Sequence, residues 1–357
     1  MKKILLFLVG GTICTKLNES GALSVSGEAG TVLTENFRKS DSVFADEIQF
    51  VTTENMFVLS ENMTVKKWNE MIKMLRRYLK NDSFDGIIFA HGTDTLAYSA
   101  ALFSMILSGT EIPALFVSSN ARPDSDRANG NDNFRCAVEC ICRGIQPNVY
   151  VPYKNISDGR MYIHMASRLK QCPNYSENFD SEGKICLSGF SNEAFEKVFA
   201  EIAEKYPQER IKKAVDLFGD LELSECVMMI TPYVGLDYEA FRYDGYKAVL
   251  HGTFHSGTVC TEKSDEYSEN SVLRMLDICS ECGTDVYLSP SRLSGEIYDT
   301  QSIVIAHENH GKRINMIYGC TTEAAYAKLL LAYSLKNNED EIKSFIETDF
   351  NFEYFCK

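Results

Sequence analysis

Residues 4–12, ILLFLVGGT, decide the fold, because they join a continuous apolar run to a glycine pair and a threonine. An apolar run of this length that ends in glycines is typical of a buried central strand in a parallel sheet. Residues 89–95, FAHGTDT, repeat this form, with an apolar strand end followed by a glycine, hydroxyls and a carboxylate. Because ligands of open parallel sheets bind beyond the carboxyl ends of the strands, both turns are candidate site segments.

The sequence around these turns alternates strand and helix patterns. Apolar runs predict strands at 4–9, 48–52, 86–90, 114–117 and 149–151, and further strands at 227–230, 248–250, 285–288 and 303–306. Helical spacing of apolar residues predicts helices after a Thr64 cap and at 95–107, 133–142, 193–205, 270–279 and 323–335. This alternation indicates βαβ units in a doubly wound, mostly parallel α/β sheet, followed by a smaller α/β domain.

The length of 357 residues is consistent with about two domains. We expect an N-terminal domain at 1–195, a linker at 196–222 around a charged stretch broken at Pro207, and a C-terminal domain at 223–357. Within the first domain, Trp68 falls on the apolar face of its helix and is expected to be a core residue.

The composition excludes several classes of protein. The chain carries 36 basic and 50 acidic residues, a net charge of −14, so a nucleic acid partner is disfavoured. The apolar run ILLFLV is shorter than the roughly 7–15 residues of a signal-peptide core, and no stretch approaches the roughly 18 apolar residues of a membrane span. We therefore expect a cytoplasmic protein without a membrane partner.

The cysteines and histidines do not form a metal-binding pattern. The 12 cysteines are spread along the chain, and they are expected to be reduced thiols. Only Cys279 and Cys282 have C-x-x-C spacing, and the absence of a second ligand pair argues against zinc. His251 and His255 are four residues apart, but the segment between them is expected to be a loop after a strand.

The two threonine turns suggest nucleophilic chemistry. Two hydroxyls facing one cleft could act as nucleophile and activator, and backbone N–H groups near a helix start could stabilise an oxyanion. A threonine needs a base, which Asp94 or a lysine of lowered pKa could provide, and spacing alone does not select the lysine. Helix capping by Thr93 or Asp94 is compatible with this role. The sequence contains no G-x-G-x-x-G after the first strand, no phosphate-binding P-loop and no G-x-S-x-G motif, which disfavours dinucleotide enzymes and α/β-hydrolases.

The chain resembles the bacterial-type L-asparaginases, and the cytosolic type I members most closely. The resemblance covers most of the chain and rests on GGTI (10–13), SENMT (60–64), HGTDTLAYSA (91–100), the segments ARPDS and NGNDNF within 121–134, SRLK (167–170), HGTFHSGT (251–258) and TTEAAYAKL (321–329).

The resemblance implies hydrolysis of L-asparagine to L-aspartate and ammonia through a threonine acyl-enzyme. It implies that Thr12 is the nucleophile and that Thr93, Asp94 and Lys170 form a second catalytic set. It further implies that Gly11, Ser60, Glu61, Gly92, Thr93 and Asp94 bind the substrate, with Ser60 at the α-carboxylate and Asp94 with Glu61 at the α-ammonium. The resemblance implies no metal or cofactor. It does imply a homodimer or a homotetramer.

The chain departs from the family pattern at several positions. Ala22 aligns with the loop tyrosine that helps to activate the nucleophile, and Ser24, Ser26 and Tyr298 are candidate substitutes. Other departures are Ser167 at a common arginine position, Ser119-Asn120 in place of a glycine-alanine pair, and Thr258 at a common asparagine position.

Two alternatives to L-asparaginase therefore stay open. One is a glutaminase or related amidohydrolase, acting on L-glutamine or a derivatised asparagine. The other is a catalytically impaired asparagine- or aspartate-binding regulatory protein. The subunit that feeds ammonia to transfer-RNA-dependent amidation is less favoured, because the first strand begins at the first residues of the chain.

Overall fold

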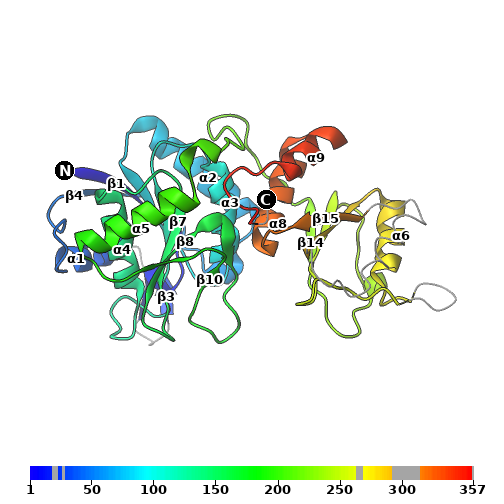
Figure 1. Cartoon of the computed structure of the whole chain (residues 1–357), viewed down its shortest axis with the longest axis horizontal. Coiled ribbons are helices and arrows are strands. Elements are labelled where there is room, and N and C mark those ends of the chain that lie inside the picture. The colour runs from blue at the N-terminus through cyan, green and yellow to red at the C-terminus, as the bar shows by residue number, and fades with distance from the viewer. Residues whose placement is uncertain (18–22, 26–28, 263–267, 292–313, 356–357) are drawn as a thin grey trace. The chain divides into compact units, whose positions relative to one another are not determined.

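The computed structural model describes residues 1–17, 23–25, 29–262, 268–291 and 314–355. The chain divides into two compact units (Figure 1). The first comprises Met1–Leu221 with Asp349–Phe352, and the second comprises Glu222–Thr348 with Glu353–Lys357. Of the residues 196–222 expected to form a linker, 196–221 lie in the first unit, where α5 (Asn192–Lys205) buries Val198 and Ile202 in the core.

The first unit contains a seven-stranded, mostly parallel sheet with the strand order β11-β8-β7-β6-β5-β1-β4. Its strands are β1 (Lys2–Leu8), β4 (Ile48–Thr52), β5 (Gly86–Ala90), β6 (Ala114–Val117), β7 (Val149–Lys154), β8 (Met161–Met165) and β11 (Ile185–Leu187). The first five of these are parallel, and β8 and β11 extend one edge in antiparallel pairing. The predicted doubly wound α/β class is confirmed.

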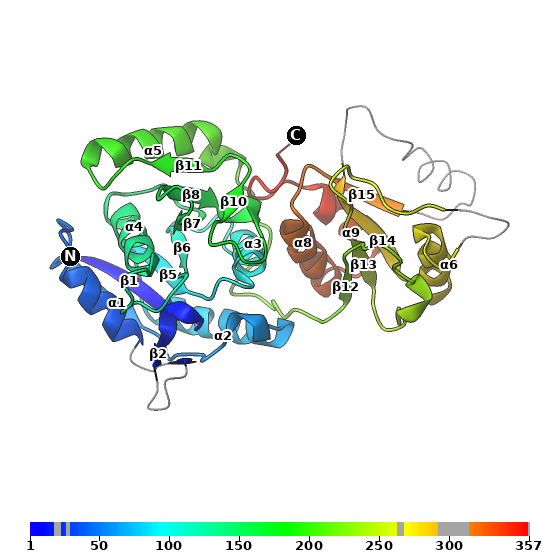
Figure 2. The same cartoon turned by 90° about the horizontal axis from the view of Figure 1, so that it is seen from below.

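Helices cover both faces of this sheet. Figure 2 shows α1 (Ala29–Arg38) and α4 (Gly130–Cys142) on one face, with α2 (Val65–Asn81) and α3 (Leu96–Ile106) on the other. In α2, Thr64 caps the first turn by accepting a hydrogen bond from the Lys67 N–H, as its position predicted. Trp68 is 5% exposed and donates its indole N–H to Ser99 Oγ at 2.9 Å, so it is the expected core residue.

The topology of the sheet places the two glycine turns side by side. β1 pairs with β4 on one side and β5 on the other, and Leu8 lies opposite Ala90 in the β1–β5 ladder. The chain leaves β1 toward β4 and leaves β5 toward β6, so the crossovers run in opposite directions. Such a reversal opens a crevice at the carboxyl ends of the strands, where ligands bind.

Short elements complete the first unit. They are the hairpin of β2 (Thr15–Leu17) and β3 (Leu23–Val25), the 3-10 turns η1 (Thr12–Cys14), η2 (Ser60–Asn62), η3 (Ala166–Arg168) and η4 (Gln208–Arg210), and the hairpin of β9 (Leu169–Lys170) and β10 (Asp180–Ser181). Residues 171–179 form the loop of the β9–β10 hairpin.

The second unit is a smaller parallel sheet with the order β12-β13-β14-β15. It comprises β12 (Val227–Ile230), β13 (Ala248–His251), β14 (Asp285–Ser291) and β15 (Ile314–Tyr318), with η5 (Tyr238–Ala240), α6 (Val272–Cys282), α8 (Thr322–Leu335) and α9 (Glu339–Glu347). Figure 2 shows α6 and α8 on opposite sides of this sheet. The predicted strand at 303–306 lies outside the described residues.

Candidate active site

The two predicted turns are in backbone contact. Gly10 and Gly11 have φ angles of 137° and 78°, a left-handed region that only glycine occupies without strain. A Cβ atom on Gly11 would lie 2.1 Å from Gly92 Cα, and one on Gly10 would lie 2.2 Å from the Val58 carbonyl oxygen. Glycine is therefore required for this close approach, which brings the residues that follow, Thr12 and Thr93, to neighbouring positions.

Ser60 joins the second turn to η2. The buried Ser60 Oγ donates to Asp94 Oδ2 at 2.9 Å and accepts from the Asp94 N–H at 3.2 Å. The Ser60 carbonyl accepts from Thr95 Oγ1 at 2.8 Å. A Cβ on Gly92 would meet Ser60 Oγ at 2.5 Å, so Gly11, Gly92, Ser60 and Asp94 form one packed cluster.

Neither Thr93 nor Asp94 caps the helix that follows, in contrast to the capping role considered from the sequence. The helix α3 begins at Leu96, its N-cap is Thr95, and this end has no side-chain cap hydrogen bond. The Asp94 carboxylate instead accepts from Ser60, and Thr93 is half-buried at the edge of a pocket. Both side chains are therefore placed by the site and not by the helix end.

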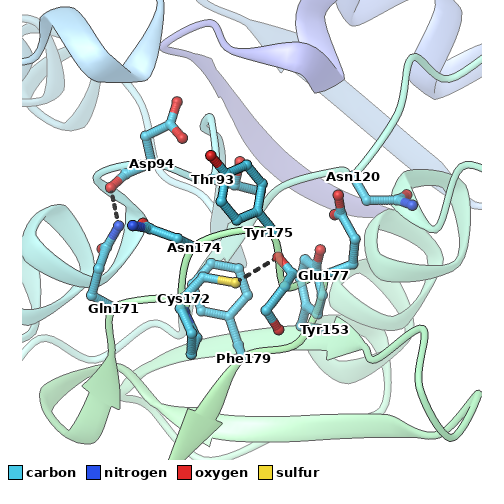
Figure 3. A pocket seen from close by; sticks show the side chains of 12 residues that line it. Thr93, Asp94, Asn120, Tyr153, Gln171, Cys172, Asn174, Tyr175, Glu177 and Phe179 are labelled. Carbon is cyan, nitrogen blue, oxygen red and sulfur yellow. Dashed lines mark hydrogen bonds between the residues drawn. The ribbon is translucent and has the colours of Figure 1, made fainter.

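A pocket of about 470 Å³ opens beside this turn (Figure 3). The residues that line it are Thr93, Asp94, Asn120, Tyr153, Gln171, Cys172, Pro173, Asn174, Tyr175, Ser176, Glu177 and Phe179. Eight of these twelve belong to the loop 171–179, which forms the wall opposite the threonine turn. The size falls within the range of about 300–1,000 Å³ typical of small-molecule sites.

The loop 171–179 is anchored at both ends. Gln171 Nε2 donates to the Asp94 carbonyl, and Cys172 Sγ donates to the Ser176 carbonyl at 3.0 Å. At the other end, the Phe179 N–H donates to Asn155 Oδ1 at 2.9 Å. Between these anchors the exposed Tyr175 has a φ of 59°, an uncommon conformation for an aromatic residue, and its ring lies over the pocket in Figure 3.

The pocket carries negative charge. Among the described residues that line it, Asp94 and Glu177 are carboxylates, and none is a lysine, arginine or histidine. Partial burial raises the pKa of Glu177 above its ordinary value, and no cation offsets this effect. Burial also raises the pKa values of the Cys172 thiol and the Tyr153 phenol, so both are held in their neutral forms at neutral pH.

The other predicted site residues lie around this pocket without lining it. Thr12 begins η1 directly after Gly11 and is half-buried. Glu61 is exposed in η2, next to Ser60. Lys170 lies at the base of the β9–β10 hairpin, where its Nζ is 3.9 Å from Asp180 Oδ2 and its side chain is 49% exposed. No hydrogen bond joins Lys170 to Thr93 or Asp94 within the described part of the chain.

The departures from the family pattern have different structural consequences. Ser119 Oγ accepts from the Gly130 N–H at 3.1 Å at the start of α4, and Asn120 lines the pocket. Ser167 is fully buried and donates to the Asn351 carbonyl at 2.7 Å. Ala22, Ser26 and Tyr298 lie outside the described residues, as does the side chain of Ser24.

The expected loop at HGTFHSGT follows β13. In the second unit, Thr258 Oγ1 lies 2.9 Å from Ser256 Oγ. His251 is buried in β13, and its Nε2 shares a hydrogen bond with Tyr238 Oη at 2.9 Å, whereas His255 is exposed.

No metal-binding cluster is present among the described residues. They contain no group of three or more His, Cys, Asp or Glu side chains placed to hold an ion. Their cysteines are unpaired thiols, with Cys279 buried and Cys282 exposed.

Sequence reasoning missed the wall formed by residues 171–179. The cluster CPNYSEN is rich in turn residues and follows the SRLK segment, which together indicate a loop next to a candidate site. Loops that are held by a rigid scaffold often carry binding residues. The sequence alone does not show that this loop faces Thr93.

The sequence matches a known protein family. Residues 3–197 match the family description "Asparaginase, N-terminal". The chain is similar to a subunit of the glutamyl-tRNA(Gln) amidotransferase from Methanococcus maripaludis strain C6, with 24% identity over 286 residues, 76% of this chain and 65% of the relative. The corresponding subunit from Archaeoglobus fulgidus shows 26% identity over 284 residues, 76% of this chain and 63% of the relative. The chain thus spans less than two thirds of the length of these relatives.

Solved structures share the fold over nearly the whole chain. The thermostable L-asparaginase from Thermococcus kodakarensis has a TM-score of 0.70 at 18% identity, with 99% of this chain and 100% of that chain covered. L-asparaginase I from Vibrio cholerae has a TM-score of 0.67 at 20% identity, with 99% of each chain covered. A probable cytoplasmic L-asparaginase from Campylobacter jejuni has a TM-score of 0.65 at 18% identity, with 98% of this chain and 100% of that chain covered. Among the described residues, no helix is both long and apolar enough to span a bilayer.

Proposed function

The chain belongs to the asparaginase family of amide-acting enzymes, and we propose that it hydrolyses L-asparagine to L-aspartate and ammonia through a threonine acyl-enzyme. The observation that carries the proposal is the backbone contact of Gly11 with Gly92 at the sheet's crevice. This contact puts Thr12 and Thr93 directly after two touching glycines, as a nucleophile and its neighbouring hydroxyl require.

In the proposed reaction, the Thr12 hydroxyl attacks the side-chain carbonyl and ammonia leaves with the nucleophile's proton. The developing oxyanion needs backbone donors. The N–H groups of Gly11 and Asp94 already donate to the Val58 carbonyl at 3.0 Å and to Ser60 Oγ at 3.2 Å. The N–H groups of Thr12 and Thr93 remain as donors in this proposal.

Charge supports the proposed orientation of the substrate. An α-ammonium group suits the exposed Asp94 carboxylate, which Ser60 Oγ orients at 2.9 Å. In the proposal, Ser60 and Gly11 contact the α-carboxylate, Glu61 adds a second negative charge near the ammonium group, and Lys170 assists Thr93. For Lys170 to do so, its ion pair with Asp180, 3.9 Å long, would have to open or carry the proton through water.

L-glutamine is the second candidate substrate. The relatives are named as subunits of a glutamyl-tRNA(Gln) amidotransferase, an enzyme that transfers an amide group, and L-glutamine carries such a group as L-asparagine does. The two amino acids differ by one methylene, which is worth only about 1–3 kcal/mol of discrimination. A pocket of about 470 Å³ has room for either.

The test is ammonia release from L-asparagine, L-glutamine and D-asparagine by the purified protein. Thr12→Ala and Thr93→Ala should each reduce turnover by orders of magnitude. Thr253→Ala is the matched control, because Thr253 follows His251-Gly252 in the second unit as Thr93 follows His91-Gly92 in the first. Full turnover in Thr93→Ala would remove Thr93 from the chemistry.

A regulatory protein would give a different result in this assay. Asparagine or aspartate would raise its melting temperature by mass action without releasing ammonia. We further propose a cytoplasmic homodimer or homotetramer, which light scattering of the purified protein would test by its mass.

A further inference from the structure

The pocket extends past the threonine turn toward a second carboxylate. In the view of Figure 3, Thr93 lies between Asp94 and Glu177, and the two carboxylates stand on opposite sides of the pocket. With the α-ammonium group at Asp94 and the amide beside Thr93, as proposed above, a substituent on the amide nitrogen has room to extend toward Glu177.

Glu177 has no ion-pair partner in the described part of the chain. Two hydrogen bonds hold the backbone here. The Glu177 carbonyl accepts from the Ile156 N–H at 3.5 Å, and Oδ1 of the next residue, Asn178, accepts from the Ser157 N–H at 3.0 Å. Tyr153 and Phe179, with ring centroids 4.8 Å apart, also line the pocket, but each is only 1% exposed. The site is thus an exposed carboxylate in a pocket whose described lining residues carry no positive charge, a combination that favours a cationic group.

We propose that Glu177 recognises a positive charge on the leaving amine, so that the pocket takes N4-substituted asparagines whose leaving group is a cationic alkylamine. This inference rests on the proposed amide hydrolysis. One water adds across the amide: the carbonyl carbon–nitrogen bond breaks, a carbon–oxygen bond forms, and the nitrogen takes a proton. For N4-(2-aminoethyl)-L-asparagine, the products are L-aspartate and ethylenediamine.

The volume of the pocket agrees with this substrate class. A cavity of about 470 Å³ exceeds what a single small amino acid needs and lies in the range of sites for drug-sized ligands. The negative charge of both carboxylates would also favour approach of a cationic substrate at low ionic strength. Added salt should therefore weaken the preference.

The experiment compares two probes of similar size. N4-(2-aminoethyl)-L-asparagine carries the positive charge, and N4-propyl-L-asparagine is its neutral counterpart. L-Aspartate release gives kcat/KM for each with the full-length protein. We expect the wild type to prefer the charged probe by about fivefold, the size of a partly screened ion pair.

The variants separate the role of Glu177 from general charge. Glu177→Gln should bring the ratio of the two kcat/KM values close to one. Glu182→Gln, an exposed glutamate of the same unit that does not line the pocket, should leave the ratio unchanged. A wild-type ratio of one, or an unchanged ratio in Glu177→Gln, would overturn the proposal.

Failure of the Glu177 proposal can be told apart from failure of the proposed amide hydrolysis. If no amide is hydrolysed, the proposed function fails, and calorimetric binding of the same two probes then decides the role of Glu177. Tighter binding of the charged probe that is lost in Glu177→Gln supports it, and equal binding of the two probes refutes it.

Discussion

Replacing Gly11 by alanine tests the contact that builds the site, without any assumption about function. The new Cβ would lie 2.1 Å from Gly92 Cα and 2.4 Å from Gly92 N. Carbon atoms pack at about 3.5–4.0 Å, and here the neighbour is backbone that cannot rotate away. The two turns must therefore separate, and the crevice must change shape.

The magnitude follows from a matched control in the same unit. Gly144 has a φ of 82°, close to the 78° of Gly11, and a Cβ there would meet nothing within 4 Å. Left-handed backbone costs an alanine about 1–2 kcal/mol, and both variants bear this cost. Overpacking adds about 1–3 kcal/mol, which only Gly11→Ala should show.

Urea unfolding followed by tryptophan fluorescence measures this difference. The chain has 1 tryptophan, Trp68, which is buried in α2 of the first unit, so its signal reports unfolding of that unit. We expect Gly11→Ala to be about 1–3 kcal/mol less stable than Gly144→Ala. Equal stability of the two variants would show that the turns are not in contact.

Three further predictions follow from buried polar groups. Burial lowers the pKa of His91 to about 4 and of His164 to about 3, so the unfolded chain binds protons that the folded chain refuses as pH falls from about 6.5. The free energy of unfolding, measured by Trp68 fluorescence, should therefore fall between pH 6.5 and 4 by up to about 3 kcal/mol for each histidine. In a His164→Asn variant, this free energy should depend less on pH. Lys328 and Glu353 form an ion pair with both side chains 0% exposed, so Lys328→Met should cost about 3–5 kcal/mol in thermal unfolding followed by circular dichroism. Adding Glu353→Leu should recover most of this loss, and no recovery would contradict the assignment. Ser60→Ala removes the hydroxyl that orients the turn's carboxylate and should lower kcat/KM about tenfold or more, whereas an unchanged kcat/KM would exclude a role for this bond.

The central strands and their helices were predictable from the sequence because their signals are local. The predicted bounds of β4, β5, β6 and β12 agree with the structure, since each is a short run rich in apolar residues. The Thr64 cap of α2 is local in the same way. The antiparallel strands β8 and β11 were not predicted, because they extend the sheet only through tertiary pairing, β8 with β7 and β11 with β8.

The sequence also determined which residue types stand at the ends of β1 and β5, and their resemblance to the asparaginases identified the family. Only the tertiary structure decided that the loop 171–179 forms the opposite wall, with Glu177 across the pocket from Asp94. It also decided that Lys170 pairs with Asp180 across the hairpin. Local spacing carries information about a strand or a turn. Contacts such as Gln171 with Asp94 join residues 77 positions apart, and they exist only after the sheet has brought its strand ends together.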